Sequence, residues 1–199
     1  MKIGLPSHEF RPLTEQELTL VWQWRNSPRI QQNMHNNEAV AWQSHCNWFE
    51  GLQIDRSRSF FVLWQNQRPI GVLNFSGLDT FTPEWGCYLG ETNVWPGSGI
   101  MLEVAALDYA AMGYVRENQL KYSHLLAQVL SFNHAANKMH KLFEYEQVRQ
   151  EPAAERDGNP FTVLHYSYEL KQWLHKREKV LNKLPKNIRL ASTQIQFLE

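Results

Sequence analysis

The sequence of 199 residues lacks several features that would assign it to a broad class of protein at once. Its two cysteines, Cys46 and Cys87, are too far apart to form a CxxC-type metal or redox motif, so we expect free thiols. The 20 basic and 20 acidic residues cancel, which argues against a general nucleic-acid binder. No segment approaches the ~18 apolar residues of a membrane span, and the first residues have no signal-peptide pattern. We therefore expect a cytoplasmic protein with no nucleic-acid or membrane partner.

Aromatic side chains, by contrast, are abundant: they make up 13% of the residues and include eight tryptophans. Large rings mostly fill a hydrophobic core. Some of them can also line a pocket for a sugar or a nucleotide base, and composition alone does not separate the two roles.

The first part of the chain predicts one strand followed by two helices. A short strand over residues 10–13 leads to Thr14, which forms a capping-box pattern with Glu17 and so predicts a helix start. Pro28 disfavours helical geometry in the residue before it, so this helix should end near residue 26. A second helix is expected over residues 39–53.

The rest of the chain predicts more strands than helices. Strands at 59–64 and 70–75 should form a hairpin around Asn66 and Gln67. They are followed by a strand at 85–89, a helix at 100–112, a strand at 124–130, a helix at 133–143 and a strand at 161–169. This order predicts an α+β fold with one mixed sheet rather than a Rossmann alternation. We expect one domain over residues 1–170, and a helical extension to about residue 184 followed by a loose tail over residues 171–199.

A loop with two glycines leads from the strand at 85–89 into the next helix. Gly97 and Gly99 let the backbone approach a ligand closely, and the helix N-terminus offers unpaired N–H groups with a partial positive charge. Together they can bind a pyrophosphate without a basic side chain. The same segment is also an ordinary strand-to-helix turn, so on its own it does not establish a phosphate-binding site.

Asn133 follows the predicted strand at 124–130 and precedes a helix. It can act as a simple N-cap of that helix, or it can hold an amide-rich ligand between two diverging strands. Only the combination with the glycine loop favours the second role.

Six segments, taken in order, carry a resemblance to a known family. They are Arg11-Pro12-Leu13-Thr14, Trp24-Arg25-Asn26, Pro69-Ile70-Gly71-Val72, Glu84-Trp85-Gly86, Pro96-Gly97-Ser98-Gly99-Ile100 and Asn133 with His140-Lys141-Leu142-Phe143. This set, which covers about residues 9–170, resembles the GNAT N-acetyltransferases. It is most similar to the branch that acetylates the 4-amino group of a UDP-linked dideoxy aminosugar in pseudaminic acid synthesis. The resemblance implies a mixed, mostly antiparallel sheet with helices on both faces, and acetyl transfer from acetyl-CoA to a primary amine.

The resemblance also implies a site for acetyl-CoA, and no metal ion. In such enzymes the glycine loop cradles the coenzyme A pyrophosphate. The matching residues here are Pro96, Gly97, Ser98, Gly99, Ile100 and Met101. The pantetheine arm lies between the strands at 85–89 and 124–130, which splay apart, and Asn133 helps to hold it. Backbone N–H groups near Leu89 would stabilise the oxyanion.

Four residues match positions near the reacting amine and the departing thiolate. His140 stands where the superfamily usually carries a tyrosine that protonates the thiolate, and Asn74 and Tyr88 match sites that face the amine. We expect Glu84, or Tyr88 acting through water, to deprotonate the amine. Each also has a structural interpretation: a surface histidine for His140, a solvent-facing carboxylate for Glu84, and a buried, hydrogen-bonded hydroxyl for Tyr88.

The acceptor side should be built from the N-terminal helices. Arg25, Met34 and His45 match positions that contact the sugar nucleotide in the aminosugar branch. The structural alternatives are a helix-closing Arg25, a loop-packing Met34 and a surface His45. The expected partner is a small-molecule acceptor, a UDP-aminosugar; acetylation of a protein N-terminus and a non-catalytic binding module stay open. A homodimer is compatible with the sequence, which does not determine the oligomeric state.

Four positions depart from the family pattern. Val94 stands where Gln or Arg usually precedes the glycine loop, and Ser98 replaces a common basic residue. Gln128 replaces a frequent acid. Glu144 replaces a glycine after the second conserved helix, and a non-glycine residue in the left-handed region there would cost about 1 kcal/mol. These departures suggest weaker coenzyme A binding than is typical.

Overall fold

The computed structural model describes residues 4–112, 115–116, 119–156 and 158–198. Eight strands form one sheet in the order β10-β1-β2-β3-β4-β7-β9-β8, and β5 and β6 form a separate small hairpin. The strands are β1 (His8–Pro12), β2 (Ser59–Gln65), β3 (Arg68–Ser76), β4 (Glu84–Leu89), β5 (Val115–Arg116), β6 (Gln119–Leu120), β7 (His124–Leu130), β8 (Glu146–Arg156), β9 (Asn159–Glu169) and β10 (Ile195–Phe197). The helices are α1 (Glu15–Arg25), α2 (Pro28–Gln31), α3 (Trp42–Ile54), α4 (Ser98–Met112), α5 (His134–Leu142), α6 (Leu170–Leu181) and α7 (Lys186–Ser192).

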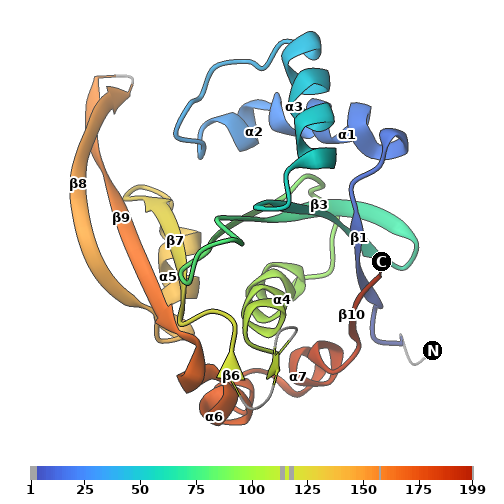
Figure 1. Ribbon diagram of the computed structural model, residues 1–199, viewed down its shortest axis with the longest axis vertical. Helices are drawn as coiled ribbons and strands as arrows, with labels where there is room; N and C mark the ends of the chain where they lie inside the picture. Colours follow the sequence, from blue (N-terminus) through green and yellow to red (C-terminus); the bar gives the residue numbers. More distant parts are fainter. Residues whose placement is uncertain (1–3, 113–114, 117–118, 157, 199) are drawn as a thin grey trace.

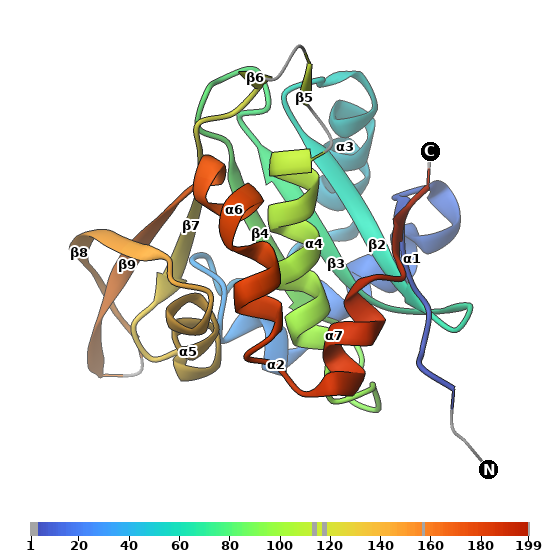
Figure 2. The same cartoon turned by 90° about the horizontal axis from the view of Figure 1, so that it is seen from below.

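The large sheet is mixed and mostly antiparallel. β1 pairs with β10 and β4 with β7 in parallel, whereas the other neighbouring strands pair antiparallel. Helices cover both faces: α1, α2 and α3 lie above the sheet in Figure 1, and α4, α6 and α7 lie below it. Figure 2 shows this lower layer from below, with α5 beside it. The α+β class expected from the sequence is therefore confirmed.

Two hydrophobic clusters join these layers. The larger one lies around α4, whose residues Leu102 and Leu107 pack with Leu63 and Leu73 of the sheet. The smaller one lies under α1 and α3, and its buried members are Leu13, Leu18, Val21, Trp24, Phe49, Val62 and Val72. At roughly 25 cal/mol per Å² of apolar surface, this burial is the main force that fixes the helices on the sheet.

Short-range signals in the sequence were read correctly at three places. Glu17 accepts a hydrogen bond from the Thr14 N–H at 3.3 Å, which closes the capping box of α1. Asn66 and Gln67 have φ values of 49° and 63° and form the turn between β2 and β3. Glu144, with a φ of 67°, adopts the left-handed conformation expected where the family carries glycine. Lys183 donates a hydrogen bond to its carboxylate at 2.6 Å.

Three expectations about elements need correction. The second helix, α3, begins at Trp42 rather than at residue 39. Residues 146–156, which received no element, form the eleven-residue strand β8. The expected loose tail is wrong, because α7 and β10 follow α6 and β10 pairs in parallel with β1.

The segment after residue 170 packs on the same core as the rest of the chain. Trp173 is fully buried, and its Nε1 donates to Asp108 of α4 at 2.8 Å. Arg177 donates two hydrogen bonds to the same carboxylate, at 2.8 and 2.7 Å. Whether residues 1–170 form an independent domain stays a prediction.

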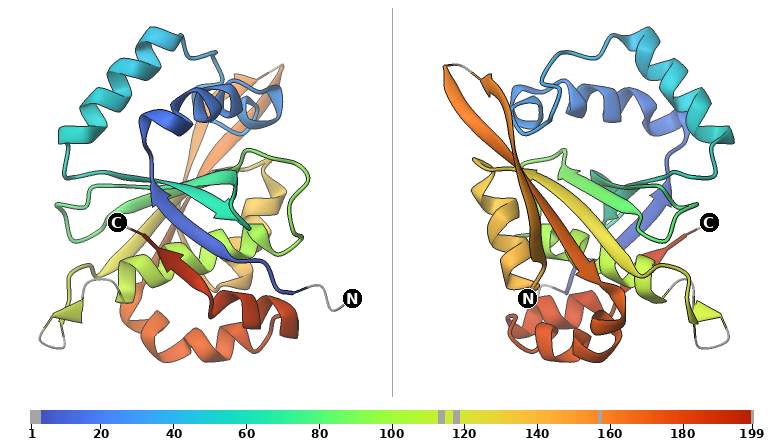
Figure 3. Two further views of the ribbon diagram at one scale, coloured as in Figure 1. Left: turned by 90° about the vertical axis from the view of Figure 1, so that its right-hand side faces the viewer. Right: turned by 60° about the vertical axis from the view of Figure 1, so that its left-hand side comes forward.

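The β8–β9 hairpin extends past the sheet to the level of α2, as both views in Figure 3 show. Arg156 at its end donates hydrogen bonds to the carbonyl oxygens of Gln32, Met34 and His35, at 2.6, 2.8 and 3.2 Å. The hairpin is therefore bound to the loop after α2, on the upper side of the sheet.

Candidate active site

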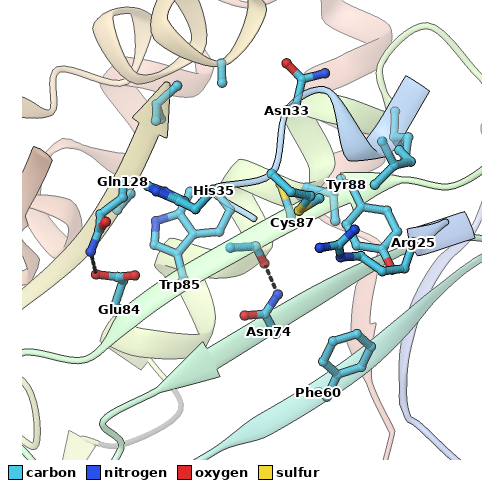
Figure 4. Close-up of a pocket in the computed structure, with 18 of the residues that line it drawn as sticks. Arg25, Asn33, His35, Phe60, Asn74, Glu84, Trp85, Cys87, Tyr88 and Gln128 are labelled. Atoms are coloured by element: carbon cyan, nitrogen blue, oxygen red, sulfur yellow. Dashed lines mark hydrogen bonds between the residues drawn. The ribbon is translucent and has the colours of Figure 1, made fainter. Parts of the chain in front are cut away.

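A cavity with a volume of about 920 Å³ lies along β4 and β7, and Figure 4 shows part of it. Ten of the residues expected at the site line this cavity: Arg25, Met34, His45, Asn74, Glu84, Tyr88, Leu89, Gly99, Asn133 and His140. The other five, from the glycine loop, are not among its lining residues: Pro96, Gly97, Ser98, Ile100 and Met101. The fold thus brings together residues from seven separate segments of the chain.

β4 and β7 are paired at one end and part beyond it. Within the described residues their one paired position is Glu84 with Leu126, where the Leu126 N–H donates to the Pro83 carbonyl oxygen at 2.9 Å. The predicted splay of these two strands is therefore present.

The divergence leaves main-chain groups of β4 facing the gap. On its other side, β4 pairs with β3, and the Gly90 N–H donates to the Ile70 carbonyl oxygen at 2.9 Å. Antiparallel pairs alternate between hydrogen-bonded and non-hydrogen-bonded positions. The N–H groups of Cys87 and Leu89 consequently point away from β3 and into the gap, where an amide-containing ligand can bind them as an added strand would.

The start of α4 provides space for an anionic group. Gly99 lies in the first turn of this fifteen-residue helix and lines the cavity. A Cβ atom placed on Gly99 would have no heavy atom within 4 Å. Open space beside a helix N-terminus fits a pyrophosphate.

The other loop residues lie mainly against the protein. Ser98 and Met101 are fully buried, and Pro96 is exposed outside the cavity lining. The N–H groups of Ile100 and Met101 donate to the Gly97 carbonyl oxygen at 3.0 Å. Contact between these five residues and a ligand stays a prediction, and Gly99 is the residue of the loop with the clearest access.

Gln65 at the end of β2 holds this loop in place, and the sequence reasoning missed it. Its Oε1 accepts a hydrogen bond from the Trp95 N–H at 3.1 Å. Its Nε2 donates to the Ser98 hydroxyl at 2.7 Å and lies 3.1 Å from Nε2 of His8. The available signal was a glutamine that closes an otherwise apolar strand.

His140 is not the surface histidine that the structural interpretation assumed. Its side chain is buried, and Nδ1 lies 3.0 Å from Oε1 of Glu103 in α4. Both residues line the cavity. The sequence reasoning missed Glu103, which stands in the middle of an apolar helix.

Asn133 serves as the N-cap of α5, since its side-chain oxygen accepts from the Ala136 N–H at 3.2 Å. The helix-capping role expected for Asn133 is therefore confirmed. Asn133 also lines the cavity, so its role in holding the pantetheine arm stays a prediction.

The polar residues of β3 and β4 lie close together in Figure 4. Asn74 donates from Nδ2 to the Gly86 carbonyl oxygen at 2.9 Å, which leaves its own oxygen available. Glu84 is half-buried, and its carboxylate accepts a hydrogen bond from Gln128 of β7 at 2.7 Å. Gln128, one of the departures from the family pattern, is thus the hydrogen-bond partner of Glu84.

Tyr88 has a hydroxyl that no hydrogen bond from another described residue reaches. Burial raises the pKa of this hydroxyl, and the nearby Arg25 cation opposes the shift. Tyr88 is therefore neutral near pH 7 and can act as a hydrogen-bond donor or pass a proton through water.

Arginines line the cavity near α1, α2 and α3. Arg25 donates from Nη2 to the Asn36 carbonyl oxygen at 2.7 Å, so it does not close its own helix, and its buried Nη1 has no partner within the described residues. Burial lowers the pKa of Arg25, although the group remains a cation. Arg29 and Arg58, which the sequence reasoning missed, also line the cavity.

His45 and Met34 complete the same wall. His45 is 4% exposed, which corrects its interpretation as a surface residue, and its Nε2 donates to the Leu18 carbonyl oxygen at 3.1 Å. Burial lowers the pKa of His45. Its ring stacks on Trp48 with a centroid separation of 5.1 Å, and Trp48 and Phe60 also line the cavity. Some aromatic side chains therefore serve the pocket as well as the core.

The described residues also bear on metal ions and membranes. No group of three or more His, Cys, Asp or Glu side chains among them is arranged to hold a metal ion. No helix in that part of the chain is long and apolar enough to cross a membrane.

The sequence profile of the "Acetyltransferase (GNAT) domain" family matches residues 9–143. The chain belongs to the GNAT acetyltransferases. This GNAT enzyme is 30% identical, over 132 residues, to the acetyltransferase PseH of Campylobacter jejuni subsp. jejuni serotype O:23/36, a match that covers 66% of this chain and 78% of the relative. The corresponding PseH of serotype O:2 is 28% identical over 132 residues, with the same coverage.

Solved structures show the same GNAT fold. The spermidine N-acetyltransferase from Vibrio cholerae, in complex with CoA and spermine, has a TM-score of 0.75 at 14% identity and covers 84% of this chain and 98% of its own. The ribosomal L7/L12 α-N-protein acetyltransferase RimL, in complex with CoA, has a TM-score of 0.65 at 15% identity and covers 82% and 94%. Acetyl-CoA is the acetyl donor of this family, and the open strand gap and the space at Gly99 fit it.

Proposed function

We propose that this GNAT enzyme acetylates the 4-amino group of a UDP-linked dideoxy aminosugar. The observation that carries the proposal is one continuous cavity, which runs from the gap beside β4 to a wall that contains Arg25, Arg29 and Arg58. The donor enters the gap, and a diphosphate-linked acceptor suits the arginine wall. The resemblance to the aminosugar branch and the two PseH relatives support the same acceptor class.

The arginine wall can recognise a nucleotide-linked sugar through charge and shape. Arg25 offers a buried Nη1 donor without a protein partner in the described residues, and arginine forks bind phosphate oxygens in a fixed geometry. Trp48 and Phe60 provide flat apolar surfaces on which a sugar or base can pack. Met34 and His45 lie on the same wall and are proposed to contact the acceptor.

The donor side supplies backbone groups rather than charged side chains. The N–H of Leu89 faces the gap, and we place it as the donor to the carbonyl oxygen on which negative charge develops. Asn133 and the start of α4 at Gly99 hold the arm and the pyrophosphate. Bound acetyl-CoA supplies the activated acetyl group, and the enzyme contributes mainly the positioning of both reactants.

Proton transfer is assigned to residues on the two sides of the reacting centre. Glu84, held by Gln128, accepts the amine proton directly or through water, and Asn74 and neutral Tyr88 orient the amine. His140 gives a proton to the sulfur as the carbon–sulfur bond breaks. The absence of a metal, of a nucleic-acid partner and of a membrane partner stays a prediction, as does a homodimer.

An acceptor screen tests this proposal. The purified enzyme is incubated with acetyl-CoA and with UDP-linked 4-amino sugars, UDP-linked 2-amino sugars, polyamines or N-terminal peptides, and release of free CoA is followed. We expect kcat/KM to be highest for a UDP-linked 4-amino sugar and UDP to compete with that acceptor. A higher kcat/KM for N-terminal peptides would assign the enzyme to protein acetylation instead.

A further inference from the structure

Glu103 and His140 form a buried pair between α4 and α5, at the floor of the cavity. Their side chains are 4% and 6% exposed, and Nδ1 of His140 lies 3.0 Å from Oε1 of Glu103. Within the described residues, no lysine or arginine forms an ion pair with Glu103. A buried carboxylate is costly unless it is paired and hydrogen-bonded, and here the histidine provides that pairing.

The pair determines which nitrogen of His140 is available. An ionised carboxylate can only accept a hydrogen bond, so the proton lies on Nδ1 and is donated to Glu103. Nε2 is then the nitrogen that Glu103 does not engage. The ring plane is held by Trp85, Tyr145 and Tyr166, whose ring centroids lie 5.7, 4.6 and 4.9 Å away. Rotation of the imidazole would break the hydrogen bond and disturb these contacts.

We propose that Glu103 is a positioning residue, which holds Nδ1–H and the ring orientation of His140 so that Nε2 of the protonated imidazole presents its proton to the departing thiolate. The proposal rests on the acid role of His140 in the proposed function. As the carbon–sulfur bond breaks, sulfur takes the bonding electron pair and the Nε2 proton. The imidazole is left neutral, with Nδ1–H still donated to Glu103, and later regains a proton from solvent.

The carboxylate contributes to this step through its hydrogen bond. Because Nδ1–H is donated to Glu103, Nε2 is the nitrogen left to carry the transferred proton. A family member with tyrosine at this position needs no such partner, because a phenol has one proton and one oxygen.

The decisive variant is Glu103→Gln, which keeps the side-chain volume but removes the charge. We expect kcat to fall about tenfold, less than the ~10²–10⁴-fold of full acid–base assistance because His140 itself remains, while acetyl-CoA affinity and acceptor KM change by less than about threefold. Glu103→Asp, which retains the carboxylate, should keep more of the activity than Glu103→Gln. Thermal unfolding of each variant checks that the fold is retained.

A double-mutant cycle shows whether Glu103 acts through His140. His140→Phe should lower kcat at least tenfold, and Glu103→Gln should have no further effect in the His140→Phe background. His140→Tyr should recover part of the loss. Equal losses from Glu103→Gln in both backgrounds would assign Glu103 a different role.

Nitrogen NMR of ¹⁵N-histidine-labelled enzyme without ligands provides a readout that does not depend on activity. We expect Nδ1 of His140 to stay protonated whether or not Nε2 carries its proton; these signals disappear in His140→Phe, and the neutral ring becomes a mixture of tautomers in Glu103→Gln. If His140→Phe retains the wild-type kcat, the acid role fails and this inference fails with it. If His140→Phe is impaired while Glu103→Gln keeps both its kcat and its fixed tautomer, this inference alone is overturned.

Discussion

The stability of the enzyme should decrease in acid because of His8, which lies beneath the coenzyme loop. His8 is fully buried in β1, and burial lowers its pKa from 6.5 to about 4. Gln65 accepts from the Trp95 N–H through Oε1, so its Nε2 must donate to Nε2 of His8. A protonated His8 would present a hydrogen to this donor and break the contact.

The size and sign of the effect follow from the two pKa values. Between pH 6.5 and about 4, the unfolded chain binds a proton at His8 that the native enzyme does not. The free energy of unfolding should therefore be highest above pH 6.5 and should fall as the pH decreases toward 4. At about 1.4 kcal/mol per pH unit, the total loss is about 3 kcal/mol.

The assay is urea unfolding of the wild type and of His8→Gln at several pH values from 7.5 to 4. We choose glutamine because its side-chain oxygen can accept from Gln65 near the position of Nε2, and it does not titrate. His45 and the other groups titrate in both proteins, so the difference between the two curves isolates His8. Parallel curves from pH 7.5 to 4 would refute the reasoning, whatever their offset.

Three further predictions concern the donor site, the acceptor site and the C-terminal segment. Gly99→Asp should weaken acetyl-CoA binding at least tenfold in calorimetry, because its carboxylate would repel the pyrophosphate. Gly99→Ala, whose Cβ meets open space, should bind acetyl-CoA nearly as the wild type does. Arg25→Lys should raise the acceptor KM without changing acetyl-CoA affinity, and the control Arg11→Lys, outside the cavity lining, should change neither. If Arg25→Lys weakens the binding of both substrates equally, Arg25 has a structural role instead. Asp108→Asn should destabilise the fold by about 2 kcal/mol in urea unfolding, because it removes the carboxylate charge that Arg177 binds in a largely buried pair. Arg68→Gln at the more exposed pair with Glu91 should cost less than about 1 kcal/mol. An Asp108→Asn variant as stable as the wild type would show that α6 does not depend on this contact.

The elements that the sequence predicted are those determined by neighbouring residues. Thr14 with Glu17 sets the start of α1, and Asn66 with Gln67 sets the turn between β2 and β3. β8 was missed because its sequence contains Pro152 and several charged residues, and its pairing with β9 determines it. β10 was missed for the same reason, since its partner β1 lies at the other end of the chain.

The candidate site shows the same limit. A motif located His140 and Gly99, but the partners that position them come from distant elements. Glu103 lies 37 residues from His140, and Gln65 lies 33 residues from Ser98. The sequence indicates no such pairing, because an acid in an apolar helix or a glutamine at a strand end can bind any of several side chains, and only the folded chain determines which.

The central claim is that the cavity brings a thioester in the strand gap to an amine held by the arginine wall. Its most direct measurement is mass spectrometry of the product from acetyl-CoA and a UDP-linked 4-amino-4,6-dideoxy sugar, with fragmentation to locate the added group. The account predicts one acetyl group on the 4-nitrogen, with free CoA formed in equal amount. An unmodified sugar nucleotide, in a reaction where the same enzyme acetylates N-terminal peptides, would contradict it.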